Sequence, residues 1–97
     1  MSETSDRIRE YIQTQSASDA RAVVLRQIRL FARKTLREYA DEHYIIDFQD
    51  TVLVQDRHRD KRTDIISDAQ SRATAANAAA NMTELLVVFD AIASFIE

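Results

Sequence analysis

The sequence predicts an all-α protein, an antiparallel helical bundle or a long helical hairpin of three to five helices, folded as a single domain over 1–97. The first observation behind this is that the 97 residues include no glycine and no proline, where average usage would give roughly seven and five. Positive-φ turns and tight hairpins mostly need glycine. The second is that apolar residues recur at three- and four-residue spacing over most of the chain, as on one face of a helix.

The composition excludes several classes of function. Apolar residues make up 45% and charged residues 30% of the chain, which is typical of a folded globular protein, and the net charge of -3 is too small to indicate a partner class. Without cysteine there is no thiolate metal site or cysteine nucleophile, and without glycine no phosphate-binding loop. The longest uncharged apolar run, 85–89, is far short of a membrane span. We therefore expect no membrane, no cofactor, and a cytoplasmic or virion location.

In the N-terminal half the spacing predicts two helices. The first begins with Ser5 as its cap and runs through Gln15. The second has Ser16 or Ser18 as its cap and continues to about Ala40. The buried stripe expected on the second helix is Val24, Ile28, Phe31, Thr35 and Tyr39, flanked by Leu25, Ala32 and Leu36.

The middle of the chain is ambiguous. Residues 41–56 are acidic and rich in β-branched and aromatic residues. This pattern favours a break near His43–Asp47 followed by a third helix, with a short β-hairpin at 44–54 as the alternative. The charged cluster 57–62 suits either a loop or an exposed helical turn.

The last third of the chain, 65–97, predicts a long helix, roughly 50 Å if unbroken. Asn81 followed by Glu84 has the pattern of a capping box, which would allow a break there. Small and then large apolar residues form one face, and uncovered apolar surface usually indicates a partner, although an ordinary bundle core fits the same pattern. The residues of this expected interaction face are Ala73, Ala76, Ala80, Leu86, Phe89, Ile92 and Ile96.

A stripe of arginines follows another face of the second helix. Its members are Arg26, Arg29, Arg33 and Arg37. Residues 18–40 carry six basic and two acidic residues, a net +4 that leaves -7 for the rest of the chain. The stripe could contact phosphates, or it could face an acidic partner, the acidic segment 41–56 or a neighbouring subunit. No aromatic platform or known nucleic-acid motif accompanies it.

Signals for catalysis are poor. His43 and His58 are the only histidines and do not have the spacing of metal ligands, and the carboxylates are scattered. The segment 58–61, His-Arg-Asp-Lys, before Ile65-Ile66-Ser67 resembles the phosphoacceptor helix of histidine-kinase dimerisation domains, which would make His58 a phosphate acceptor. The residues Arg62, Thr63 and Asp64 depart from that motif.

A second resemblance concerns residues 13–15 and 20–27, which are similar to a stretch in the coat proteins of rod-shaped, tobacco-mosaic-like viruses. Asp60-x-Arg62-x-x-Ile65-Ile66 is similar to a later motif of that family. The resemblance implies that Arg62 lies near RNA, but the family's Arg-Phe-Pro element is absent and this chain is much shorter.

Together these patterns favour a non-enzymatic structural or interaction subunit. We expect a small self-associating helical protein that acts as an assembly component, adaptor or inhibitor, with a virus or phage as a fitting setting. Its expected partner is a second copy or another protein. The alternative is a nucleic-acid-associated helical protein, coat-like or small-subunit-like, that uses the arginine stripe.

Overall fold

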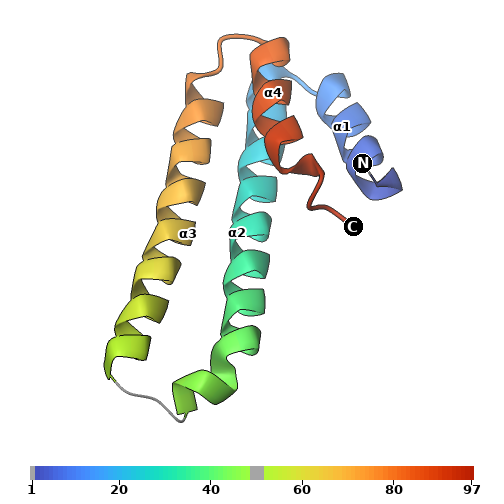
Figure 1. Cartoon of the computed structure of the whole chain (residues 1–97). Coiled ribbons are helices and arrows are strands. Elements are labelled where there is room, and N and C mark those ends of the chain that lie inside the picture. The colour runs from blue at the N-terminus through green and yellow to red at the C-terminus, as the bar shows by residue number, and fades with distance from the viewer. Residues whose placement is uncertain (1, 49–51) are drawn as a thin grey trace.

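A computed structural model describes residues 2–48 and 52–97, with side chains described for 2–39 and 61–97. The elements are α1 (Glu3–Thr14), α2 (Ala17–Phe48), α3 (Val52–Ala78) and α4 (Met82–Ala93), shown in Figure 1. No described residue lies in a strand. The predicted all-α class is confirmed, and the four helices fall within the predicted three to five.

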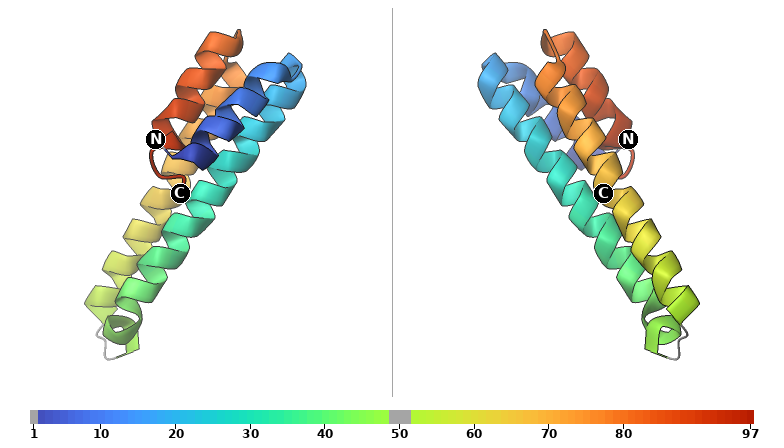
Figure 2. Two further views of the ribbon diagram at one scale, coloured as in Figure 1. Left: turned by 90° about the vertical axis from the view of Figure 1, so that its right-hand side faces the viewer. Right: turned by 90° about the vertical axis from the view of Figure 1, so that its left-hand side faces the viewer.

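The long helices α2 and α3 form an antiparallel hairpin, and the short helices α1 and α4 cover only one end of it (Figures 1 and 2). The molecule is elongated, 50 × 27 × 16 Å along its principal axes. At the covered end four helices pack together, and beyond it the hairpin continues as a two-helix arm (Figure 2). This arrangement leaves part of the seam between α2 and α3 without a covering helix.

The chain reverses direction between helices without any residue at positive φ among those described. Gln15, at the end of α1, has φ -90° and ψ 162°. Asn81, before α4, has φ -153° and ψ 174°. Extended residues of this kind end a helix at no steric cost for any side chain, so connections without glycine suffice here.

Local capping explains three of the helix starts. Asn81 Oδ1 accepts from the backbone N–H of Glu84 at 2.9 Å, and the Glu84 carboxylate accepts from the N–H of Ala80 at 2.7 Å. The break near Asn81 is thereby confirmed. Ser16 Oγ accepts from the N–H of Asp19 at 3.3 Å, as expected for a cap of α2.

The predicted cap of α1 is wrong. Ser2 is the N-cap, and its side chain accepts from the N–H of Ser5 at 3.1 Å. Ser5 lies inside the helix, where it is buried and donates its hydroxyl proton to the carbonyl of Ser2. Ser2 Oγ also donates to the carbonyl of Ile96 at 2.7 Å, which ties the two ends of the chain together.

In the middle of the chain the predicted position of the break is wrong, although a third helix follows it as predicted. Helix α2 does not end near Ala40 or break at 43–47; it continues to Phe48, and α3 begins at Val52. Residues 44–48 and 52–54 are therefore helical and not a β-hairpin, while 49–51 lie outside the described residues. Extending an existing helix costs less than starting a new one, and strand propensity has little effect without a sheet to pair with. The cluster 57–62 is helical, within α3.

The core lies at the four-helix end. Fully buried side chains of α4, Phe89 and Ile92, pack with Ile12 of α1 and with Val24 and Ile28 of α2. In the predicted stripe of α2, Val24 and Ile28 are buried, and Phe31, Thr35 and Tyr39 are half-buried. The stripe becomes more exposed toward the arm because α1 and α4 do not extend that far (Figure 2).

Candidate helix-binding groove between α2 and α3

The residues of the expected interaction face are placed mostly inside this chain. Ala76, Phe89 and Ile92 are 0% exposed and Leu86 is 7% exposed. Ile96 and Ala73 are half-buried, and Ala80 is exposed just beyond the end of α3. Phe89 and Ile92 thus contact the protein's own helices, and a contact between subunits through this face remains a prediction.

A different surface is open: an apolar groove of about 510 Å³ along the seam between α2 and α3. Its lining residues are Leu25, Ile28, Arg29, Ala32, Arg33 and Leu36 from α2, and Ile66, Ala69, Gln70 and Ala73 from α3. None of them belongs to α1 or α4. The alanines on both helices leave this hollow, because a methyl side chain fills little of the space between two helices.

Apart from Ile28, which is buried, the apolar residues of the groove are only partly covered. Leu25, Ala32 and Leu36 are half-buried, and Ile66 is 48% exposed. A soluble helix normally turns such residues toward a neighbour. The groove therefore leaves apolar surface of both α2 and α3 exposed to water.

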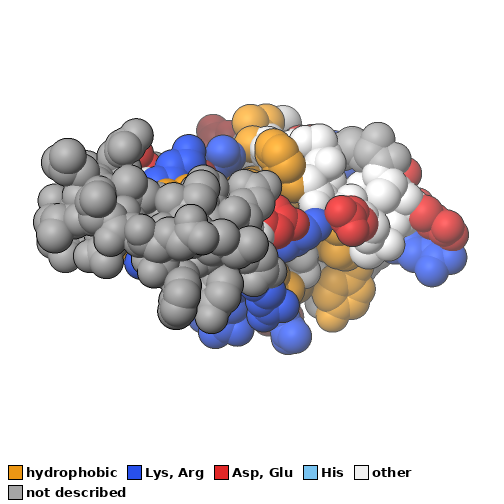
Figure 3. All heavy atoms as spheres, turned by 60° about the horizontal axis from the view of Figure 1, so that its bottom comes forward, with side chains coloured by type: hydrophobic (Ala, Val, Ile, Leu, Met, Phe, Trp, Pro, Cys, Tyr) orange, Lys and Arg blue, Asp and Glu red, His pale blue; other side chains and the backbone are white. Residues whose placement is uncertain are grey.

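Positive charge borders the groove on the α2 side. Arg29 and Arg33 line it, and both are exposed, as are Arg26 and Arg37 on the same helix. With Leu30, three of these arginines (Arg26, Arg29 and Arg33) also surround a smaller hollow of about 320 Å³ on α2. Figure 3 shows Lys and Arg side chains on several parts of the surface, with one group along its lower side. The four arginines of the predicted stripe are thus exposed along one helix, α2.

These arginines are not neutralised within the described part of the chain. No ion pair there involves Arg26, Arg29, Arg33 or Arg37. The alternative pairing with acidic side chains of 41–56 falls outside the described side chains. The ten lining residues of the groove include two arginines and no carboxylate.

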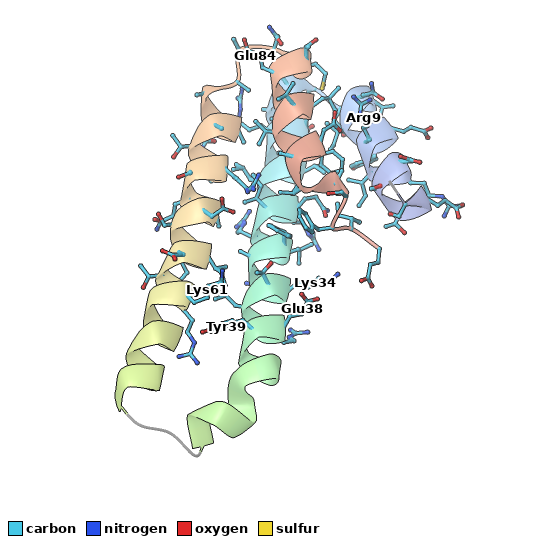
Figure 4. The ribbon with its side chains drawn as sticks, in the orientation of Figure 1. Arg9, Lys34, Glu38, Tyr39, Lys61 and Glu84 are labelled. Atoms are coloured by element: carbon cyan, nitrogen blue, oxygen red, sulfur yellow. The ribbon has the colours of Figure 1, made fainter. Side chains whose placement is uncertain are left out.

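On another part of the α2–α3 seam the surface has mixed charge. A hollow of about 270 Å³ is lined by Phe31, Ala32, Thr35, Lys61, Asp64, Ile65, Asp68 and Ala69. Figure 4 shows Lys61 of α3 and Tyr39 of α2 extending into the space between the two helices. This hollow contains both signs of charge, whereas the charged residues that line the larger groove are both arginines.

Aromatic contacts hold the end of α4 next to this mixed hollow. The rings of Phe31 and Phe95 lie 5.1 Å apart at 34°, and the guanidinium of Arg72 lies 6.0 Å from the Phe31 ring. Lys34 Nζ lies 3.3 Å from a carboxylate oxygen of Glu97 and 3.9 Å from one of Glu38, and Figure 4 shows Lys34 beside Glu38. These contacts fix the C-terminus along α2.

The chain's tertiary ion pair at the covered end joins α1 to α4. Arg9 donates to both carboxylate oxygens of Asp90, at 3.0 and 3.2 Å. These hydrogen bonds and the charge of Asp90 raise the pKa of Arg9 above its ordinary value, so the guanidinium stays charged. The pair orients α1 on α4 and does not border the groove.

Several groove residues were not predicted as site residues. Ile66 and Gln70 were read as parts of a long C-terminal helix, and Leu25, Ala32 and Leu36 only as flanks of the buried stripe. Helical spacing predicts which of these residues lie on the same face of a helix. It does not predict which part of that face α1 and α4 cover.

The search for metal ligands covers the described residues. They contain no group of three or more His, Cys, Asp and Glu side chains placed to hold a metal ion. The side chains of His43 and His58, including the phosphoacceptor position that the resemblance gives His58, lie outside the described set. In the described parts of the chain, no helix combines the length and the apolar character needed to cross a bilayer.

Comparisons with protein families, with curated proteins and with solved structures find no significant match to this chain. The groove, its charged border and the packing around it are therefore the basis for a functional proposal.

Proposed function

We propose that this chain is a non-enzymatic helical interaction protein, a small structural or adaptor subunit that binds a helix of a protein partner between α2 and α3. The observation that supports this is the apolar groove of about 510 Å³ that no helix of the described chain covers. An amphipathic helix in an apolar groove is a recurring mode of recognition, with anchors at i, i+3 or i+4, and i+7. Such a subunit suits a cytoplasmic or virion setting.

The architecture supports this proposal. The four-helix end buries Phe89, Ile92 and Val24 completely, so it can hold the hairpin together without a partner. The groove residues Leu25, Leu36 and Ile66, in contrast, have part of their apolar surface in water. A third helix laid along the seam would bury that surface, and each large apolar side chain that becomes fully buried contributes about 1.5–3 kcal/mol.

The proposal is tested with an uncharged helical peptide that carries leucines at i, i+3, i+4 and i+7 and glutamines elsewhere. The peptide is titrated into the isotope-labelled full chain, and backbone amide shifts are followed by NMR. We expect the shifts to concentrate on Leu25, Ala32, Ala69 and Ala73, and not on α1. Shifts spread evenly over the surface, or their absence at millimolar peptide, would contradict the proposal.

A matched pair of variants ties binding to the groove itself. Ala73→Leu places a larger side chain in the groove, whereas Ala75→Leu places it at an exposed position outside the groove lining. We expect Ala73→Leu to lose most of the binding and Ala75→Leu to keep it, with both proteins helical by circular dichroism. Solution mass measured over a concentration series shows whether self-association, expected from the sequence, occurs and whether Ala73→Leu changes it.

A second candidate function is favoured by one observation. Arg26, Arg29, Arg33 and Arg37 are all exposed and follow one edge of α2 without a described ion pair. A row of arginines can follow the phosphates of a nucleic acid. The apolar residues beside the row favour a protein partner, since contact with phosphates would not bury their apolar surface.

A further inference from the structure

The border of the groove indicates what kind of helix would fit it. Arg29 and Arg33 line one wall, while the ten lining residues offer no carboxylate. We propose that the occupant is an acidic amphipathic helix of another protein, with its apolar face in the groove and its carboxylates against the arginines of α2. This inference rests on the proposed function and adds the charge of the partner.

The spacing of the arginines suits such a helix. Arg29 and Arg33 are four residues apart and lie one above the other on α2, about 6 Å apart along the axis. The whole row from Arg26 to Arg37 extends over about 16 Å, or three helical turns. Carboxylates four residues apart on a partner helix that runs along the groove would meet successive arginines. Arginine is suited to this role because its planar guanidinium can bind a carboxylate through two hydrogen bonds.

A second copy of the chain fits the groove less well than an acidic partner. If two copies joined groove to groove, the contact would place the same residues on both sides. Each side would bring Arg29 and Arg33, and neither would bring a carboxylate from the lining. Like charges across an interface are strongly unfavourable, so self-association through this groove would lack the counter-charge that an acidic helix provides.

The mixed hollow on the α2–α3 seam serves as an internal comparison. Asp64 and Asp68 lie there with Lys61, so we expect that surface to bind acidic and basic helices without a strong preference. We therefore expect the groove, and not the mixed hollow, to prefer an acidic helix. This preference should be lost when the arginines of the groove are replaced.

The test uses two synthetic helical peptides with the same leucine face. One carries glutamates on the flank beside the leucines, and its twin carries lysines at the same positions. Binding to the full chain is measured by fluorescence anisotropy at low and physiological salt. We expect the glutamate peptide to bind at least about tenfold more tightly than the lysine peptide at low salt, with the difference shrinking as salt is added.

Two charge reversals of equal size then locate the effect. Arg29→Glu changes the border of the groove, and Arg7→Glu makes the same change of charge on α1, where Arg7 is exposed. We expect Arg29→Glu to remove or invert the preference and Arg7→Glu to keep it. Equal binding of the two peptides, or the same loss in both variants, would overturn the acidic partner even if the uncharged peptide still binds.

Solution mass decides between this occupant and a second copy. We expect Ala73→Leu to leave the solution mass of the chain unchanged, because any self-association would not use the groove. A dimer that Ala73→Leu converts to monomer would show that the chain itself fills its groove, and would overturn the inference.

Discussion

Arg21 in α2 holds the end of α3, because its Nη2 donates to the carbonyl oxygen of Ala79 at 2.9 Å. Its Nε donates to the carbonyl of Ala76 at 3.1 Å. The last carbonyls of a helix have no partner within the helix, and positive charge is favourable there. One side chain thus satisfies the end of α3 and joins it to the helix that forms the other wall of the groove.

Replacing Arg21 should therefore weaken the hairpin. Arg21→Met keeps much of the length of the side chain but removes both hydrogen bonds, and we expect the free energy of unfolding to fall by about 1–3 kcal/mol. Urea denaturation followed by circular dichroism measures this. Arg26→Met, at an exposed position on the same helix, is the control and should change stability by no more than about 0.5 kcal/mol. Equal effects of the two substitutions would mean that Arg21 does not act as a cap.

Phe89 should matter through packing inside one chain. It is fully buried against residues of α1, α2 and α4. Phe89→Ala removes the whole ring and leaves a cavity, and we expect a loss of about 3–5 kcal/mol in the free energy of unfolding. If the variant does not fold, Phe89→Leu, a smaller reduction at the same site, should still lower the melting temperature.

The control for Phe89 is Val87→Ala on the same helix, since Val87 is 64% exposed. Its stability should stay within about 0.5 kcal/mol of the wild type. A Phe89 variant with the melting temperature of the wild type would show that the four-helix end is not packed as described.

The junction between α3 and α4 should depend on Asn81. Its side chain accepts from the N–H of Glu84, and Asn81→Ala should cost about 1 kcal/mol of stability. Asn77→Ala, at an exposed position in α3, should be neutral or slightly stabilising, because alanine favours a helix interior more than asparagine does. Thermal unfolding of both variants gives the comparison, and equal melting temperatures would exclude a capping role for Asn81.

Features that depend on a few neighbouring residues were predictable from the sequence. The Asn81–Glu84 cap and the Ser16 cap need only four consecutive residues of sequence, and both are present. The helical class followed from the absence of glycine and proline. The end of α2 was not predictable in the same way, since residues 43–48 contain neither a breaker nor a strong helix signal, and the helix simply continues.

Features that depend on distant residues were missed. Arg21 was counted among the basic residues of the second helix, although its partners lie 55 and 58 positions further along the chain. Ser5 was chosen as a cap because serine favours that position, whereas packing buries it inside α1 and leaves the cap to Ser2. The groove is uncovered because α1 and α4 are short. How far they cover α2 and α3 depends on tertiary packing and cannot be predicted from any one segment of the sequence.

The arginine edge of α2 separates a protein partner from a nucleic acid. If Arg26, Arg29, Arg33 and Arg37 bound phosphates, four contacts on duplex DNA would give a log–log slope of affinity against salt of about -3.6, at about -0.9 per contact. We expect only weak binding without sequence preference, because the row lies beside an apolar groove that phosphates leave uncovered. The measurement is a salt titration with labelled duplex and single strands on the wild type and on Arg29→Glu/Arg33→Glu. Both arginines are exposed, so the double variant should keep the wild-type mass and helicity. Tight binding with a slope near that value, abolished in a double variant that remains folded, would favour a nucleic-acid partner over the acidic helix. The arginines alone would then account for binding, without a contribution from the apolar groove.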